Sequence, residues 1–312
     1  MSKLRQAAAL AAAVLFTAAT GVLALPWPAS ASASTARRTY IYFDNYGAGG
    51  GGATIGRASL SGTGVRHRFI TGADGPVGIA VHDGYIYWSN PGVESGSPGT
   101  TIGRAKVTGH DVRQAFIKGL NSPHSIAVSG RYIYWVSRFG DSIGRADLNG
   151  THVRQHFITG ASGPWGIAVH GDYIYWSNFG EGGGSNGTTI GRARLNGSHV
   201  NQHFIKGADT PAGIAVSGNY VYWSNFGPGG SGSTIGRARL NGTHVDNHLV
   251  TGALVPGGIA IHDGHVYWSD FGGGGGGGGT MIGRAHLNGT HADRHFITGA
   301  DTPTGIAIAV TG

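Results

Sequence analysis

Four short apolar runs within one stretch of the sequence decide the fold. They read Pro164-Trp-Gly-Ile-Ala-Val-His170, Tyr173-Ile-Tyr-Trp-Ser-Asn178, Ile190-Gly-Arg-Ala-Arg-Leu-Asn-Gly197 and Val200-Asn-Gln-His-Phe-Ile-Lys-Gly-Ala208. Each run is rich in β-branched or aromatic residues and is bounded by Gly, Asn, Asp or Pro, which is typical of β-strands joined by turns. The stretch therefore predicts four consecutive strands, which we call A, B, C and D.

This unit occurs six times along the chain. Its Ile-Gly-Arg-Ala segment begins at Ile55, Ile102, Ile143, Ile190, Ile235 and Ile282, at intervals of 41 to 47 residues. The aromatic residue of strand B falls at Phe43, Trp88, Trp135, Trp176, Trp223 and Trp268. A repeat of this length with four strands indicates a propeller blade, because a lone four-stranded sheet cannot bury both faces without neighbours.

The phase of the repeat predicts how the ring closes. The repeats begin at a strand B, residues 40–45, and end with an extra strand A, residues 305–310. The fold prediction is an all-β protein, a six-bladed β-propeller of four-stranded antiparallel blades. In it, the C-terminal strand A joins the N-terminal strands B, C and D, and this closure covers the sheet edges. We expect the propeller to span residues 40–312, after a short linker at residues 34–39.

The N-terminus has the features of a secretory signal peptide over residues 1–33. Lys3 and Arg5 precede an apolar stretch at residues 7–25, and small residues allow cleavage after Ala31 or Ala33. The alternative is an uncleaved anchor, since the stretch approaches membrane-spanning length. Cleavage predicts a secreted protein without stable membrane insertion, whose formal net charge falls from +7 to +5.

Composition excludes several classes of function. The absence of Cys excludes disulfide scaffolds, Cys-based zinc sites and thiol chemistry. Charged residues make up only 12% of the chain, which excludes a charge-rich coiled coil. Glu94 and Glu181 are the only glutamates, so little material is present for Glu-based acid–base catalysis.

Histidine and arginine recur at fixed places in the repeat. The pairs His152/His156, His199/His203, His244/His248 and His291/His295 flank or lie in strand D, where four residues span about 13 Å. That distance is too long for one metal ion, so we expect neither a metal nor a cofactor. One arginine also occupies every strand C, at Arg57, Arg104, Arg145, Arg192, Arg237 and Arg284. Even spacing favours a repeated structural contact, with carbonyls or Asn/Asp of the next blade, over a nucleic-acid surface.

The connections carry two further patterns. Asn-Gly dipeptides at Asn149, Asn196, Asn241 and Asn288 predict type I′ turns between strands C and D, with positive φ at both central residues. The B–C loops are rich in Gly at residues 47–52, 91–99, 180–187, 227–232 and 272–279. No helix follows these loops, so they are not phosphate-binding loops.

The order of the three motifs resembles the YWTD repeat of the low-density-lipoprotein receptor, also called the class B repeat. The likeness rests on Tyr-Trp-Ser-Asn or Tyr-Trp-Ser-Asp in strand B, Ile-Gly-Arg-Ala-x-Leu-Asn-Gly in strand C and Pro-x-Gly-Ile-Ala-Val in strand A, over residues 40–310. It implies a six-bladed propeller that binds other molecules, commonly proteins, without catalysis. The final Asp of the family motif is matched only by Asp270.

The repeat also resembles the streptogramin B (virginiamycin B) lyase family. That family places a Gly-Ile-Ala strand, a Trp-Phe-Thr-Glu strand and an Ile-Gly-Arg strand in the same order. The resemblance implies a magnesium-dependent carbon–oxygen lyase that relies on His and Glu in a seven-bladed ring. Here the corresponding positions of strand B hold no Glu, and there are six repeats.

Candidate binding residues are sought where the repeats differ. The residue after the strand-A proline is Val77, His124, Trp165, Ala212, Gly257 or Thr304. The D–A and B–C connections of a propeller share one face near the central channel, so an exposed Trp beside a His there suits a small aromatic, sugar or peptide ligand. The alternative is that Trp165 merely plugs the channel. The candidate ligand-binding residues are Trp165, His124, Val77, Thr304, Arg138 and Asp270, and none is predicted to be catalytic.

These patterns lead to three hypotheses of function. The first is a secreted, non-catalytic binding or interaction module, monomeric, whose partner is an unknown protein, peptide or small molecule and not nucleic acid. The second is a metal-dependent lyase of the streptogramin B lyase type. The third is an extracellular structural protein without a small ligand. Fold alone does not choose among them.

Overall fold

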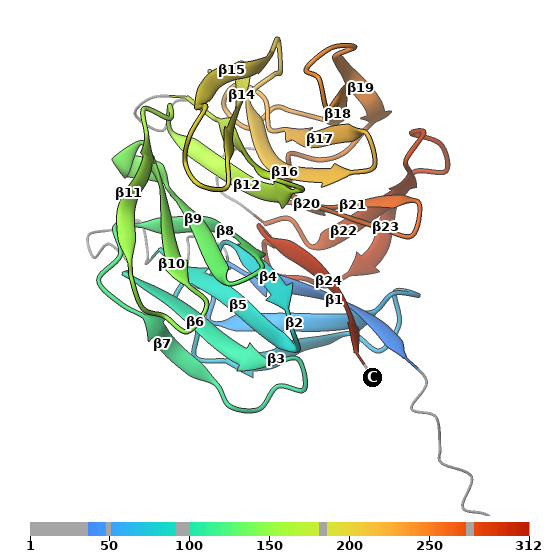
Figure 1. Cartoon of the computed structure of the whole chain (residues 1–312). Coiled ribbons are helices and arrows are strands. Elements are labelled where there is room, and N and C mark those ends of the chain that lie inside the picture. Colours follow the sequence, from blue (N-terminus) through green and yellow to red (C-terminus); the bar gives the residue numbers. More distant parts are fainter. Residues whose placement is uncertain (1–36, 48–50, 92–99, 181–185, 273–277, 312) are drawn as a thin grey trace, which may run out of the picture. The chain divides into compact units, whose positions relative to one another are not determined.

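The computed structural model describes residues 37–47, 51–91, 100–180, 186–272 and 278–311. Within them the chain forms 24 strands in six four-stranded sheets (Figure 1). The predicted signal peptide lies outside the described residues, as do the middle parts of four Gly-rich loops. The six-bladed, all-β prediction is confirmed.

Each blade contains one strand of each kind. The A strands are β24 (Ile306–Thr311), β4 (Ile79–His82), β8 (Pro123–Ser129), β12 (Pro164–His170), β16 (Pro211–Ser217) and β20 (Pro256–His262). The B strands are β1 (Arg38–Asn45), β5 (Tyr85–Asn90), β9 (Tyr132–Ser137), β13 (Tyr173–Asn178), β17 (Tyr220–Asn225) and β21 (His265–Asp270). The C strands are β2 (Thr54–Ser59), β6 (Thr101–Lys106), β10 (Ser142–Asp147), β14 (Thr189–Arg194), β18 (Thr234–Arg239) and β22 (Met281–His286). The D strands are β3 (Arg66–Thr71), β7 (Arg113–Ile117), β11 (Arg154–Thr159), β15 (Asn201–Lys206), β19 (Asp246–Thr251) and β23 (Asp293–Thr298). Blades 1 to 6 are numbered in the order of their B strands.

The C-terminal strand completes blade 1, as the repeat phase predicts. In Figure 1 the red β24 lies beside the blue β1, and the sheet order is β24-β1-β2-β3. Phe43 of β1 stands opposite Ile306 of β24 in antiparallel register. The two chain ends are therefore joined through a full strand pair rather than through a loop contact.

A buried carboxylate reinforces this closure. Asp44 has no exposed surface and accepts hydrogen bonds from the backbone N of Thr304 (2.7 Å), its Oγ1 (2.9 Å) and the backbone N of Gly305 (2.7 Å). Burial raises the pKa of Asp44 well above its ordinary value, and the three hydrogen bonds oppose that effect. We call Asp44 and Thr304 the closure pair.

In other blades a serine occupies the position of Asp44 and makes the equivalent hydrogen bonds. In blade 4, Ser177 Oγ accepts from Gly166 N (2.8 Å) and donates to the Ala212 carbonyl of the next blade (2.6 Å). In blade 1 Asp44 only accepts, and the Thr304 hydroxyl lies 3.0 Å from the carbonyl of Val77 in blade 2. Each such polar bridge ties neighbouring A strands together around the channel.

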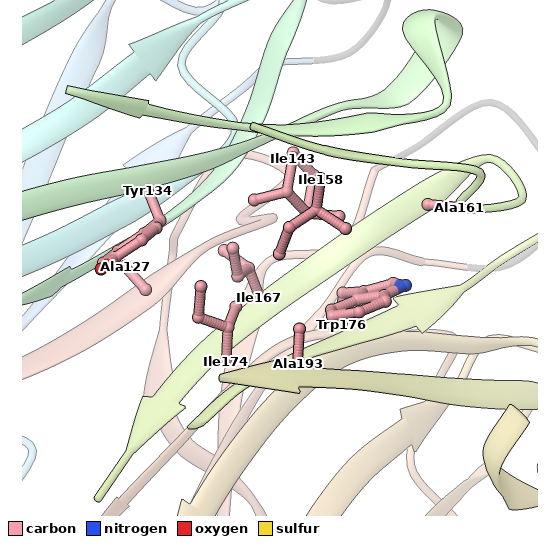
Figure 2. Close-up of a cluster of buried hydrophobic side chains, with 10 residues drawn as sticks. Ala127, Tyr134, Ile143, Ile158, Ala161, Ile167, Ile174, Trp176 and Ala193 are labelled. Carbon is pink, nitrogen blue, oxygen red and sulfur yellow. The ribbon is translucent and has the colours of Figure 1, made fainter. Parts of the chain in front are cut away.

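The core lies between blades. Figure 2 shows Trp176 of blade 4 in one cluster with Ile143 and Ile158 of blade 3. Trp176 is fully buried and stands opposite Gly191 of β14, where an added Cβ would collide with the indole ring. The Gly of every Ile-Gly-Arg-Ala motif faces the strand-B aromatic residue of its own blade in this way.

The repeated arginines are sandwiched between aromatic rings. The guanidinium carbon of Arg192 lies 4.4 Å from the ring centroid of Tyr173 and 3.8 Å from that of Phe204. The same sandwich holds Arg57, Arg104 and Arg145. The predicted structural contact is confirmed, although aromatic rings rather than Asn or Asp supply most of it.

The Asn-Gly turns differ from the prediction. Gly197 has φ of 85°, but Asn196 is not among the residues with positive φ, so the type I′ prediction is wrong. Gly197 N donates to the Arg194 carbonyl (2.8 Å), and Asn196 Oδ1 accepts from Ser198 N (3.0 Å). Because the Asn side chain closes its own turn, only the Gly of the Asn-Gly dipeptide takes the left-handed region.

Truncating Trp176 should destabilise the propeller strongly. Trp176→Ala removes a fully buried ring from the interface of blades 3 and 4, so we expect the free energy of unfolding to fall by about 3–5 kcal/mol. Denaturant titration measures the change. Phe139→Ala is the matched control, because Phe139 is 66% exposed and should cost less than about 0.5 kcal/mol. A loss below that control value for Trp176→Ala would contradict this account of the core.

Removing β24 should abolish closure. A chain that stops after Thr304 lacks the strand that covers β1, so the edge of β1 is exposed and the ring loses one interface at each side of blade 1. We expect a broad, non-cooperative thermal transition by circular dichroism. A truncated chain that melts sharply at the temperature of the full chain would refute this role of β24.

Candidate functional site

A narrow cavity of about 70 Å³ lies where the A strands begin. Val77, His124, Trp165 and Thr304 line it, four of the six predicted binding residues. The rest of its lining comes from the Gly-Ile or Ser-Ile pairs that follow these positions in the A strands. The structure therefore brings these four residues together at one mouth of the channel.

Glycines in the A strands allow neighbouring blades to lie close together around this channel. A Cβ at Gly166 would collide with the Ala212 carbonyl of the next blade, and one at Gly213 with the Gly257 carbonyl. The A strands can approach closely because these positions carry no side chain. Blade 3 has Ser125 at the equivalent position, so this glycine is replaced at the junction of blades 3 and 4.

Trp165 stands at that junction and is half-buried. Its ring lies 4.4 Å from that of His124 in an edge-on arrangement and 4.5 Å from that of Phe179. The guanidinium carbon of Arg138 lies 4.3 Å from the Trp165 ring centroid, within cation–π distance. Arg138 thus joins the predicted group by contact with Trp165. The Trp ring bridges a cation, an imidazole and an apolar cluster.

His124 is a neutral imidazole at this site. It is only 6% exposed, and burial lowers its pKa to about 3, with the positive charge of Arg138 as the second cause. Its Nδ1 lies 3.3 Å from the Trp165 carbonyl, which can only accept. Nδ1 therefore carries the proton, and Nε2 keeps its lone pair as a hydrogen-bond acceptor.

Blade 3 also has the shortest B–C connection. Four residues, including the 3-10 turn Arg138–Gly140, join β9 to β10, whereas eight to ten residues join the B and C strands of the other blades. Phe139 on this turn is 66% exposed, although the residue before it packs on Trp165. Sequence reasoning missed Phe139. The available signal was the interval of 41 residues between two repeats, against 45 to 47 elsewhere.

An arc of aromatic rings continues from Trp165 along the mouth. Phe179, Phe226 and Phe271 each follow the last residue of a B strand, and successive ring centroids lie 5.3 and 5.8 Å apart. Tyr46 occupies the same position in blade 1, 6.5 Å from Phe271. Phe179 and Phe226 are buried and pack against the Trp165 ring, so this arc does not offer a wide exposed surface.

Asp270 lies apart from these residues. It is fully buried and absent from the cavity lining, and its Oδ1 accepts from Leu254 N (3.1 Å) and Trp268 Nε1 (3.0 Å). Its Oδ2 has no partner. Asn225 at the same place in blade 5 uses its Nδ2 to donate to Thr234 Oγ1 and the Asn247 carbonyl. The structure thus places Asp270 in a scaffold position built for an amide.

Among the residues that the structure describes, no helix is long and apolar enough to cross a membrane. Over the same ranges, no group of three or more His, Cys, Asp or Glu side chains is placed to hold one metal ion.

Solved structures share the fold. A chain of the nidogen/laminin complex matches with a TM-score of 0.66 and 21% identity, over 87% of this chain and 98% of that one. The resemblance to YWTD propellers is confirmed at the level of the fold. A gluconolactonase of Xanthomonas campestris matches with a TM-score of 0.57 and 17% identity, over 76% of this chain and 82% of the other. Virginiamycin B lyase of Staphylococcus aureus follows with a TM-score of 0.48 and 21% identity, over 76% and 71%. No protein-family model and no curated protein matches the sequence.

Replacing Asp270 with the amide should stabilise the propeller at neutral pH. Burial raises the pKa of Asp270 from 3.8 to about 6, so the carboxyl favours folding below pH 3.8 and that contribution is lost as pH rises through about 6. Asp270→Asn should remove this slope and add up to about 3 kcal/mol at neutral pH. Urea titrations over the pH range measure it, with Asn225→Asp as the reverse control. An unchanged pH slope in Asp270→Asn would contradict the assignment.

Proposed function

We propose that the chain is an exported, non-catalytic binding module that takes its ligand at the channel mouth, beside blade 3. One observation carries the proposal: blade 3 departs from the repeat at four positions near the mouth. Ser125, Val136, Ser137 and Arg138 stand where the other blades carry Gly, Ser or Asp, Asn or Asp, and an aromatic residue or Pro. A scaffold role would keep these positions like their copies, so the departures support a local function.

The side chains at this junction suit a planar ligand. Trp165 offers a half-buried ring, Phe139 an exposed one, and Arg138 a guanidinium between them, 5.3 Å from the Phe139 ring centroid. Aromatic faces and a guanidinium bind aromatic groups, sugar rings and peptide side chains by stacking and by hydrogen bonds. The short blade 3 connection supports access from this side.

The chemistry of the lining favours binding over catalysis. His124 is the one titratable side chain among the residues lining the cavity, and its depressed pKa keeps it neutral at physiological pH. A lyase mechanism needs a base and a means to stabilise an anion, and a metal-dependent one needs convergent ligands as well. The described lining includes no carboxylate to serve either purpose.

The basic residues, apolar stretch and small-residue run at the N-terminus support export of the protein.

The partner can be a peptide or protein as well as a small molecule. The similar chain of the nidogen/laminin structure belongs to a complex between proteins, so such a partner suits the fold. We expect the propeller to act as a monomer.

A fixed ligand panel tests the proposal. We would screen immobilised short peptides, monosaccharides, disaccharides and small aromatic acids against the full chain, and measure affinities of the binders with Trp165→Ala. This variant should lose binding by at least about tenfold, because aromatic anchors dominate such sites. It should cost only about 1–2 kcal/mol of stability, since the ring is half-buried.

Matched controls separate site from scaffold. Arg138→Ala should weaken the same binders, whereas His244→Ala, in an exposed turn between C and D strands, should leave them unchanged. Binders that tolerate both mouth substitutions would overturn the location. Chemical conversion of a panel member, followed by mass spectrometry, would overturn the non-catalytic assignment in favour of an enzyme. A panel without any binder would favour the structural protein.

A further inference from the structure

We propose that blade 6 carries a binding site for a divalent transition-metal cation, held by the imidazoles of His265 and His286. Both residues lie at the opposite end of the strands from the channel mouth: His265 begins β21 and His286 ends β22. The proposal is therefore independent of the ligand site at blade 3.

Strand register places histidines in one row across the blade. His262 of β20 stands opposite His265, and His265 stands opposite His286. Directly opposed residues point to the same face of a sheet with Cβ atoms about 5 Å apart. The ring centroids of His265 and His286 are 4.7 Å apart, and His291 from the following turn stacks on His286 at 4.7 Å.

Blade 6 is the one blade with this row. The other B strands carry Tyr40, Tyr85, Tyr132, Tyr173 and Tyr220 at the position of His265. The other C strands carry Ser59, Lys106, Asp147, Arg194 and Arg239 at the position of His286. The Tyr of this position stacks on the strand-C arginine in the other blades, so blade 6 replaces a structural contact with a second imidazole.

The His265 ring is oriented for metal binding by a backbone carbonyl. His265 Nδ1 lies 2.7 Å from the Asp263 carbonyl, which only accepts. The proton is therefore on Nδ1 and Nε2 presents a lone pair, the arrangement in which a carbonyl orients a metal-binding histidine.

The geometry fits a site with two protein ligands. Two nitrogens bound to one ion at about 2.0–2.1 Å stand about 3.3 Å apart, within reach of two opposed imidazoles that rotate about their side-chain bonds. The remaining positions go to water or to the flanking His262 and His291. No three described groups already converge on one point, so the site is open and its affinity modest. Imidazole ligands select Cu²⁺, Ni²⁺ and Zn²⁺ over Mg²⁺ or Ca²⁺.

Metal titration tests the site directly. We would titrate Ni²⁺ into the full chain, purified without a polyhistidine tag, by isothermal calorimetry, and record Cu²⁺ spectra by electron paramagnetic resonance for bound nitrogens. His265→Tyr and His286→Arg restore residues found in other blades, so both variants should fold. Each should weaken the strongest Ni²⁺ site by at least about tenfold. His199→Ala, in the C–D turn of blade 4, is the control that should leave this site unchanged.

Building the same pair of histidines in another blade tests whether the pair is sufficient for metal binding. Tyr173→His combined with Arg194→His builds the same opposed pair in blade 4, where the two positions are also directly opposite. This double variant should bind a second equivalent of Ni²⁺. The proposal is overturned if His265→Tyr binds Ni²⁺ as the natural chain does, because other histidines then account for binding. It is equally overturned if the natural chain binds no Ni²⁺ or its bound Cu²⁺ shows fewer than two nitrogen ligands.

Discussion

Every blade depends on the contact between an aromatic ring on its B strand and a glycine on its C strand. Trp176 lies over Gly191, and the space that a Cβ would take is filled by the indole, which then reaches the aliphatic side chains of the preceding blade. Six such rings set the spacing between sheets, because each fills the interface that its own sheet cannot fill alone. In four blades the Arg that follows the Gly is held between two aromatic rings, so the Ile-Gly-Arg-Ala motif makes two structural contacts.

This constraint also defines where the chain is free to vary. Positions at and beyond the ends of the B and C strands lie at the margin of the packed interface, so they can change without loss of the ring. Blade 3 has changed at the mouth, with a short connection and with Arg138 beside Trp165. Blade 6 has changed at the opposite end, with His265 and His286 in place of Tyr and a polar residue. Divergence in a repeat protein is informative because the identical copies show what the scaffold alone requires.

Much of the fold and part of the site could be predicted from the sequence. The repeat spacing and the phase of strand A were sufficient for six blades and their closure, because burial between identical units leaves few other arrangements. The mouth position of Trp165 and His124 followed from the same topology. The type of the turn between strands C and D could not be predicted in this way, because the Asn196 side chain competes with the backbone for hydrogen bonds. The short loop that carries Phe139 was readable from the repeat interval, but its contact with the Trp165 side depends on how the blades assemble, as do the partners of Asp270.

The closure pair has a consequence for how the protein reaches its folded state. Asp44 and Thr304 are 260 residues apart, so their contact closes a loop that contains nearly all of the propeller. The entropy of such a loop is lost before its contacts form, and long-range pairing of this kind slows folding. A ribosome makes β24 after the other described strands, so blades 2 to 6 can form while the edge of β1 that β24 covers is still open. The rate of the final step, rather than the stability of any blade, then governs how long an aggregation-prone edge is open.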